Sequence, residues 1–454
     1  MLSRRRFLQA LAAAGASAST RAQTPSIDRF ALVSRHNPRL TKIDPLSPLS
    51  LGNGEFAFTA DVTGLQTFPR LYAGAMPLCT MSQWGWHTRP LPTALESQTL
   101  RPRLYETYGR KVGYNTSSEG QTELFNWLRE NPHRLHLGQI GLDINPAHIS
   151  DINQELDLWR GILNSKFKIA GKPVSVTTAV HPERDLLAVI IEPPLAVRIA
   201  FPYASPSMQA ADWNADEKHQ TRIMADQKVI ARQLDGDAYY VAVQGQLKVE
   251  GRHTFRLTSA AKRFEFVVEF SQHKPSEALP TAAETIAASE RNWQRFWTHG
   301  AAVELAHSKD ERAVELERRV VLSQYLTAIQ CSGSMPPQET GLTVNSWYGK
   351  FHLEMHWWHA THLALWNRLP LFERSLHWYE SILPRAVELA RSQGYRGARW
   401  PKMVGPEGRD SPSPSSSRHW RRPTTGQRSS RSSSATSAAP RGPAPRGRGS
   451  GCTC

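Results

Sequence analysis

The chain has 454 residues and a formal net charge of +15. Eight arginines lie in residues 415–454 and four in residues 1–22, and neither segment contains an acidic residue. Residues 23–414 therefore carry a formal charge of +3, which argues against a nucleic-acid-binding surface. This central part contains two cysteines, Cys79 and Cys331, and they imply no disulfide framework.

Residues 1–22 predict a twin-arginine signal peptide. The stretch Arg4-Arg5-Arg6-Phe7-Leu8 is followed by a short, weakly apolar run that is rich in alanine. That run is too short to cross a bilayer, so we expect no stable membrane anchor. The sequence thus predicts export by the twin-arginine machinery of a bacterium, with a mature protein that is periplasmic or secreted.

Residues 29–275 show the alternation of apolar and polar positions that is typical of strands with one buried face. Phe56–Val62 alternates in this way after the turn Gly52-Asn53-Gly54, and so does Val174–Val180 after Gly171-Lys172-Pro173. We expect a large antiparallel β-sandwich. The glycine turn lacks the Lys-Ser/Thr of a phosphate-binding loop, so we interpret it as a hairpin turn.

The period becomes helical after about residue 282. We predict a linker helix over residues 282–300, an α-helical domain over residues 301–414, and within it a long helix from Asp310 to Cys331. Apolar residues then recur at steps of four and three over Leu371–Gln393, which predicts one further helix. Pro384 should kink this helix and Gly394 should end it.

Histidines crowd the stretch from Asn345 to Trp366, so a metal site has to be considered. On a continuous helix His352, His356 and His359 would lie within about 60° of one another, but Glu354 would lie on the opposite side. The order of a His-Glu-x-x-His zinc motif is also absent. We therefore expect neither a metal nor another cofactor.

A helix that starts near Glu354 and ends before Pro370 explains this stretch better. Glu354 would lie in the first turn, where the helix dipole favours a carboxylate. The preceding loop would present Trp347, Lys350 and His352 to a pocket, with His356 and Trp357 on the helix itself. Aromatic rings beside such polar groups suit sugar recognition. The alternative is that the tryptophans pack between helices and that the histidines satisfy buried backbone groups.

Residues 398–412 predict a loop, because they are rich in proline and glycine. Glu407 and Asp410 are either catalytic acids or a solvated pair beside Arg409. Trp400, Lys402 and Arg409 are candidate substrate-binding residues. Together with Glu354, the two acids complete the candidate catalytic set.

Residues 415–454 contain no Val, Leu, Ile, Met or Phe, and no Asp, Glu or Lys. Such a composition cannot bury enough apolar surface to fold, so we expect a disordered tail. It is also the composition of a GC-rich gene read out of frame, and we expect that the natural reading frame continues differently after Pro414.

Several stretches together resemble the six-hairpin glycosidase superfamily, which includes maltose and trehalose phosphorylases and α-L-fucosidases. The resemblance covers about residues 30–414. It is carried by Leu51–Phe56, Glu155–Gly161, Asp185–Val189, Trp293-x-x-Phe296-Trp297, Trp347–Trp358 and Gly397–Pro401.

The resemblance implies a β-sandwich followed by an (α/α)6 toroid, here incomplete, and inversion at an anomeric carbon by an acid and a base. It implies that Glu354 contacts sugar. Lys350 and His352 stand where the fucosidases have an Asn-x-Asn pair. The family's general acid falls further along the toroid than this chain reaches.

We accordingly expect an exported glycoside hydrolase that acts on an oligosaccharide or glycan, inactive as a truncated chain. The alternatives are a non-catalytic glycan-binding protein and a polysaccharide lyase.

Overall fold

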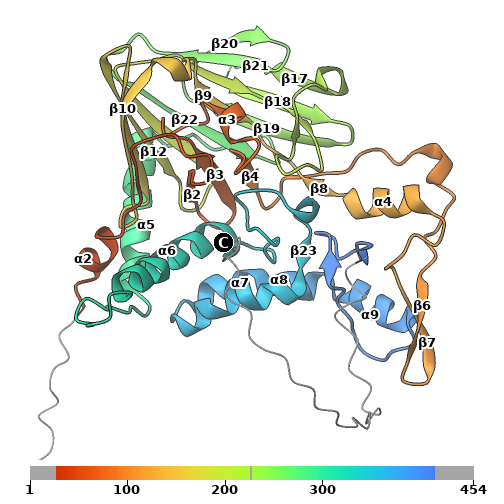
Figure 1. Ribbon diagram of the computed structural model, residues 1–454. Coiled ribbons are helices and arrows are strands. Elements are labelled where there is room, and N and C mark those ends of the chain that lie inside the picture. The colour runs from red at the N-terminus through yellow and green to blue at the C-terminus, as the bar shows by residue number, and fades with distance from the viewer. Residues whose placement is uncertain (1–26, 225–227, 415–454) are drawn as a thin grey trace, which may run out of the picture.

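The computed structural model describes residues 27–224 and 228–414 (Figure 1). The predicted order of a β-sheet part followed by helices is confirmed, since long strands continue to Ser271 and helices dominate from Ala282 onward. The predicted signal peptide and the predicted disordered tail lie outside the described residues. Within the described ranges, no helix is long and apolar enough to cross a membrane.

The largest element is an antiparallel sheet of nine strands. Most sequence neighbours are also neighbours in this sheet, which is the pattern of hairpin connections. Its strands, in spatial order, are β1 (Arg39–Leu40), β10 (Ile149–Asp157), β11 (Ile162–Ile169), β12 (Lys172–Val180), β13 (Leu186–Glu192), β22 (Phe264–Ser271), β19 (Asp237–Val243), β18 (Val229–Leu234) and β17 (His219–Ile223).

A second antiparallel sheet shares its core with the first. Its strands are β20 (Gln246–Gly251), β21 (Thr254–Thr258), β14 (Val197–Ala200) and β9 (Gln139–Leu142). One apolar cluster joins Val176 and Val189 of the large sheet to Ile199 and Phe255 of the smaller one. The two sheets therefore pack as a sandwich.

The shorter strands form one three-stranded sheet and four separate pairs. They are β2 (Leu49–Gly52), β3 (Phe56–Ala60) and β4 (Thr80–Ser82) in one sheet, and the pairs β5 (Trp86–His87) with β8 (His133–Arg134), β6 (Arg103–Thr107) with β7 (Arg110–Tyr114), β15 (Tyr203–Ala204) with β16 (Ala211–Asp212), and β23 (Phe351–His352) with β24 (Met403–Val404). The α-helices are α2 (Arg29–Ser34), α3 (Pro69–Tyr72), α4 (Thr122–Glu130), α5 (Ala282–Thr298), α6 (Ala313–Cys331), α7 (Leu353–Leu365), α8 (Leu369–Ser381) and α9 (Leu383–Ser392).

Helix α5 covers the outer face of the large sheet. Thr281 caps it in a capping box with Glu284, which satisfies backbone N–H groups at its start. Leu186 and Ala188 of β13 pack with Ala282 on this face, while Val189 faces the sandwich core. Burial on both faces explains why every residue of β13 except Glu192 is buried, with no alternation.

The stretches that carry the family resemblance meet one another in the core. Gly161 has a φ of +66°, and a Cβ there would lie 2.0 Å from Cδ1 of Trp293. The indole N–H of Trp297 donates to the carbonyl of Leu158 (2.6 Å). These residues thus hold α5 against the sheet, which is a structural role.

The turn Gly52-Asn53-Gly54 joins β2 to β3, so the predicted hairpin is confirmed. The side-chain amide of Asn53 donates to the carbonyls of His181 (2.9 Å) and Arg184 (3.1 Å). The N–H of Gly54 donates to the carbonyl of Ile329 on α6 (3.1 Å). The turn therefore ties the sandwich to the first helix of the helical part.

Helices α6 to α9 form a layer along one side of the sandwich (Figure 1). The prediction of one helix over Leu371–Gln393 is wrong, because the chain forms α8 and α9 with a break at Ile382. Pro384 occupies the first turn of α9, where its missing N–H needs no partner. Gly394 follows the end of α9 with a φ of +74°, as predicted. Closure of these helices into a toroid remains a prediction.

Candidate functional site

The structure brings the two predicted site stretches together through a short strand pair. Phe351 and His352 in β23 pair with Val404 and Met403 in β24. The N–H of Leu353 then donates to the carbonyl of Lys402 (2.9 Å). The start of α7 and the loop around residue 402 are therefore side by side, although about fifty residues separate them in the chain.

A cavity of about 410 Å³ lies at this junction. Its wall comes from the end of β7, the start of α7, helix α9 and the loop of residues 399–410. The β6–β7 hairpin reaches it by packing on α9, and Figure 1 shows both at the same end of the molecule. The lining residues are Tyr114, Asn115, Thr116, Leu353, Glu354, Leu389, Gln393, Arg399, Trp400, Pro401, Lys402 and Asp410.

Glu354 lies in the first turn of α7, as predicted, and lines the cavity. Its carboxylate forms an ion pair with the ammonium of Lys402 (2.9 Å). Its side chain is 41% exposed, so a ligand in the cavity can reach it. The N-terminal end of the helix dipole favours a carboxylate at this place.

Asp410 lines the same cavity from the loop. The side-chain amide of Asn115 donates to its Oδ2 (2.9 Å). Burial raises the pKa of Asp410 to about 6, although this hydrogen bond and the charges of Arg399 and Lys350 oppose the shift. Asp410 therefore holds its proton at a much higher pH than an exposed aspartate does.

Lys350 and Arg409 lie close to Asp410. Lys350 is 1% exposed, and its ammonium donates to the carbonyl of Asn131 (2.8 Å). Arg409 donates to the same carbonyl (2.7 Å). Burial lowers the pKa of Lys350 to about 7, and the positive charge of Arg409 lowers it further. Burial also lowers the pKa of Arg409.

Trp400 presents an aromatic ring to the cavity. It packs edge-on against Tyr379, with ring centroids 6.0 Å apart. Its indole N–H is buried and has no hydrogen-bond acceptor. The contact with Tyr379 thus holds the ring in place.

The histidines of α7 and β23 face the protein interior. His356 hydrogen-bonds to Ser375 and to Tyr379, each at 2.9 Å, so both ring nitrogens are occupied. Nδ1 of His352 lies 3.4 Å from the carboxylate of Glu339. Burial lowers the pKa of both histidines to about 4, so both are neutral at physiological pH. His356 therefore binds two side-chain hydroxyl groups inside the protein, and not the backbone groups that the alternative named.

Three other predicted residues lie outside the cavity lining. Trp357 is 67% exposed on the outer face of α7. Glu407 is exposed, and its charge acts on Arg409. The ring of Trp347 contacts the ring of His352, with centroids 5.7 Å apart. The guanidinium of Arg129 lies over the ring of Trp347. Of the predicted site residues, Glu354, Trp400, Lys402 and Asp410 line the cavity.

Sequence reasoning missed several lining residues. Tyr114 and Asn115 lie more than two hundred residues before α7, and no local motif marks them. Arg399 was part of the predicted loop but was not selected. Glu339 lies beside His352. Burial raises the pKa of Glu339, the charge of Lys402 lowers it, and the charge of Glu354 raises it.

A possible metal site in the sandwich does not fit a cation. Ligand atoms of Asp216, His219 and His253 lie within 4.8 Å of one another. However, the guanidinium of Arg232 donates to Nδ1 of His219 (2.8 Å), which leaves a proton on the other ring nitrogen. His253 is bonded at both nitrogens, to Thr221 and to the carbonyl of Asp216. The positive charge of Arg232 also disfavours a metal ion.

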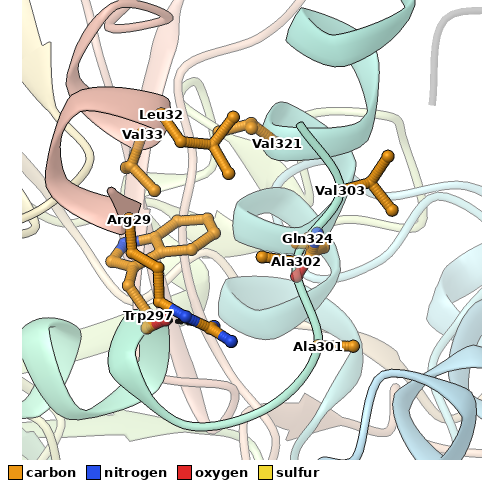
Figure 2. A pocket seen from close by; sticks show the side chains of 9 residues that line it. All are labelled: Arg29, Leu32, Val33, Trp297, Ala301, Ala302, Val303, Val321 and Gln324. Carbon is orange, nitrogen blue, oxygen red and sulfur yellow. Dashed lines mark hydrogen bonds between the residues drawn. The ribbon is translucent and has the colours of Figure 1, made fainter. Parts of the chain in front are cut away.

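A second hollow lies between α2, α5 and α6. Figure 2 shows Leu32, Val33 and Val321 on one side of it and Trp297 on another. Its volume is about 10 Å³, roughly the space of a single water molecule. We interpret it as a packing defect of the core.

No family model and no curated protein sequence matches the chain. Among solved structures, one described as "Putative kojibiose phosphorylase from human microbiome" is similar, with a TM-score of 0.55 and 10% identity. The likeness covers 84% of this chain and 53% of that chain, so the present chain spans about half the length of its structural neighbour. The chain therefore shares a β-then-α fold with this structure over most of its length.

Proposed function

We propose that the cavity binds an oligosaccharide or glycan and that the protein hydrolyses a glycosidic bond in it with inversion. One observation carries the proposal: Glu354 and Asp410 come from separate stretches and line one cavity in opposite electrostatic settings. Glu354 forms an ion pair with the ammonium group of Lys402, whereas burial raises the pKa of Asp410 to about 6. Two carboxyl groups with environments that differ in this way are typical of an acid and a base at one site.

Asp410 would donate its proton to the leaving glycosidic oxygen, which is the role of a carboxyl group with a raised pKa. Glu354 is the other carboxylate of the lining; it would accept hydrogen bonds from sugar hydroxyls and take the proton of the attacking water. Trp400 offers a flat face for the C–H surface of a pyranose. Lys402 would hold Glu354 in position.

The kojibiose phosphorylase in the comparison and the superfamily resemblance both support a glycoside-active protein. We favour hydrolysis over phosphorolysis, because an exported enzyme gains no energy from making a sugar phosphate outside the cytoplasm. Export rests on Arg4-Arg5-Arg6-Phe7-Leu8, and Edman sequencing of protein recovered from the periplasm tests it by locating the cleavage site.

The test is a panel of oligosaccharides, assayed for binding by calorimetry and for turnover by product analysis with and without phosphate. Asp410→Asn should remove turnover and keep binding, while Glu354→Gln should weaken both. Glu407→Gln is the matched control, because it removes an exposed carboxylate from the same loop. Turnover that is unchanged in both Asp410→Asn and Glu354→Gln would show that the chemistry lies elsewhere.

A non-catalytic glycan-binding protein is the second candidate. The ion pair between Glu354 and Lys402 favours it, because a paired carboxylate is a weaker base for water. Binding without turnover, in a protein where Asp410→Asn changes nothing, would select this function. An unsaturated product would select a polysaccharide lyase.

A further inference from the structure

Arg399 stands out in the cavity because its charge has no close partner. In residues 27–224 and 228–414, no carboxylate forms an ion pair with it, although its charge acts on Asp410 from a greater distance. Its guanidinium donates to the side-chain carbonyl of Gln393 and lies over the ring of Tyr114, 4.6 Å from the centroid. A guanidinium has five N–H donors, and Gln393 occupies one of them.

The two carboxyl groups of the lining form no ion pair with this guanidinium, although Asp410 is near enough for the charge of Arg399 to lower its pKa. Glu354 is already paired with Lys402, and Asp410 already accepts a hydrogen bond from Asn115. The cavity thus contains a guanidinium that no described carboxylate neutralises within ion-pair distance. Close to it lie two more basic side chains, Lys350 and Arg409.

The position of Arg399 is also fixed before any ligand arrives. Its backbone N–H donates to the carbonyl of Ala386 (2.8 Å). Stacking on Tyr114 and the hydrogen bond to Gln393 orient the plane of the guanidinium. A planar fork that is held in this way binds two oxygens of a carboxylate or sulfate with little further loss of entropy.

We propose that the cavity is specific for glycans that carry an anionic substituent, with Arg399 as the residue that binds its oxygens. This inference rests on the proposed function, since it names the substrate class of the same cavity. The shared chemistry is a pair of anionic oxygens on a sugar ring. A uronate carboxylate and a sulfate ester are the two sources of that chemistry.

Matched ligands test the proposal on the full chain. Oligouronides are compared with their methyl esters, and sulfated oligosaccharides with their desulfated forms, by calorimetry. One anionic series should bind at least about tenfold more tightly than its neutral counterpart, in line with a charge-assisted hydrogen bond. The series that shows the preference identifies the anion.

The variant Arg399→Met should remove the preference, because it removes the guanidinium and keeps an unbranched aliphatic side chain beside Tyr114. Arg399→Lys should restore part of it, because the charge remains and the fork is lost. Arg396→Met is the control, since Arg396 is exposed and lies outside the lining, and the preference should persist. Unfolding midpoints of all variants show whether they fold.

The outcomes separate the two proposals. Equal affinity for charged and neutral forms, or a preference that survives in Arg399→Met, would overturn the anion specificity and leave a glycan site in place. Failure of every charged and neutral glycan to bind would overturn the proposed function itself. A tenfold preference that is lost only in the Arg399 variants supports both.

Discussion

Replacement of Asp410 by asparagine should stabilise the protein at neutral pH. Asp410 lies at the cavity with its pKa raised by burial from 3.8 to about 6. Asparagine has nearly the same shape, and its side-chain oxygen can still accept the hydrogen bond from Asn115. The substitution therefore removes the titrating proton and leaves the packing almost unchanged.

The sign and size of this change in unfolding free energy follow from the linkage between protonation and folding. The folded state binds the proton of Asp410 more tightly than the unfolded chain does, so ionisation costs folding free energy as the pH rises from about 4 to about 6. The difference between the two pKa values corresponds to at most about 3 kcal/mol. Below about pH 4 the carboxyl group is neutral in both states and the cost disappears.

Urea unfolding of the wild type and Asp410→Asn at pH 4, 5, 6 and 7 measures this effect. The variant should gain little at pH 4 and up to about 3 kcal/mol of unfolding free energy at pH 7. Glu407→Gln, in the same loop but exposed, should show no comparable trend. A gain that is the same at every pH, or a loss at pH 7, would refute the assignment of a raised pKa to Asp410.

Three further predictions concern the surroundings of the site and the fold. Lys350→Met should move the titration of Asp410 to higher pH, because the charge of Lys350 lowers the pKa of Asp410; the same pH series measures this, and no movement would contradict it. Gly161→Ala should lower the free energy of unfolding by about 3 kcal/mol, because the position has a positive φ and the new Cβ would clash with Trp293. Gly171→Ala should lower it by about 1 kcal/mol, because that position has a positive φ but open space around it. Equal unfolding midpoints for the two variants would exclude the clash. The exposed side chains of Trp358 (70%) and Leu365 (85%) on one face of α7 predict self-association in sedimentation experiments, and Trp358→Gln with Leu365→Gln should reduce it; a monomer in both proteins would contradict this.

Local patterns predicted the fold well where one short segment decides the structure. The turn at Gly52–Gly54, the helix that starts at Ala282 and the place of Glu354 in the first turn of α7 were all predicted from nearby residues. The prediction of one helix over Leu371–Gln393 failed because the apolar stripe continues across two helices. Pro384 begins the second helix there, where the sequence suggested a kink within one helix.

The candidate site was predictable only in part, because distant segments complete it. The strand pair β23–β24 and the β6–β7 hairpin bring their residues to α7 by tertiary contacts, and hydrophobic periodicity carries no information on such contacts. Asn115 was missed for this reason, whereas Arg399 lay in the predicted loop and was not selected. His356 and Trp357 were selected because their residue types suit sugars, whereas the structure places one in the interior and the other on the outer face.

A raised pKa alone does not identify the functional carboxyl group of this protein. Burial raises the pKa of Asp61, Asp185 and Asp410 alike to about 6. Asp61 accepts hydrogen bonds from Thr63 and Phe68, and Asp185 from Ser82 and Trp84, so each is satisfied inside the sandwich. Asp410 accepts a side-chain hydrogen bond from Asn115 and borders a cavity large enough for a sugar ring. The difference lies in access to a ligand: under the proposed function Asp410 is the carboxyl group that transfers the proton, while the hydrogen bonds of the other two satisfy them inside the sandwich.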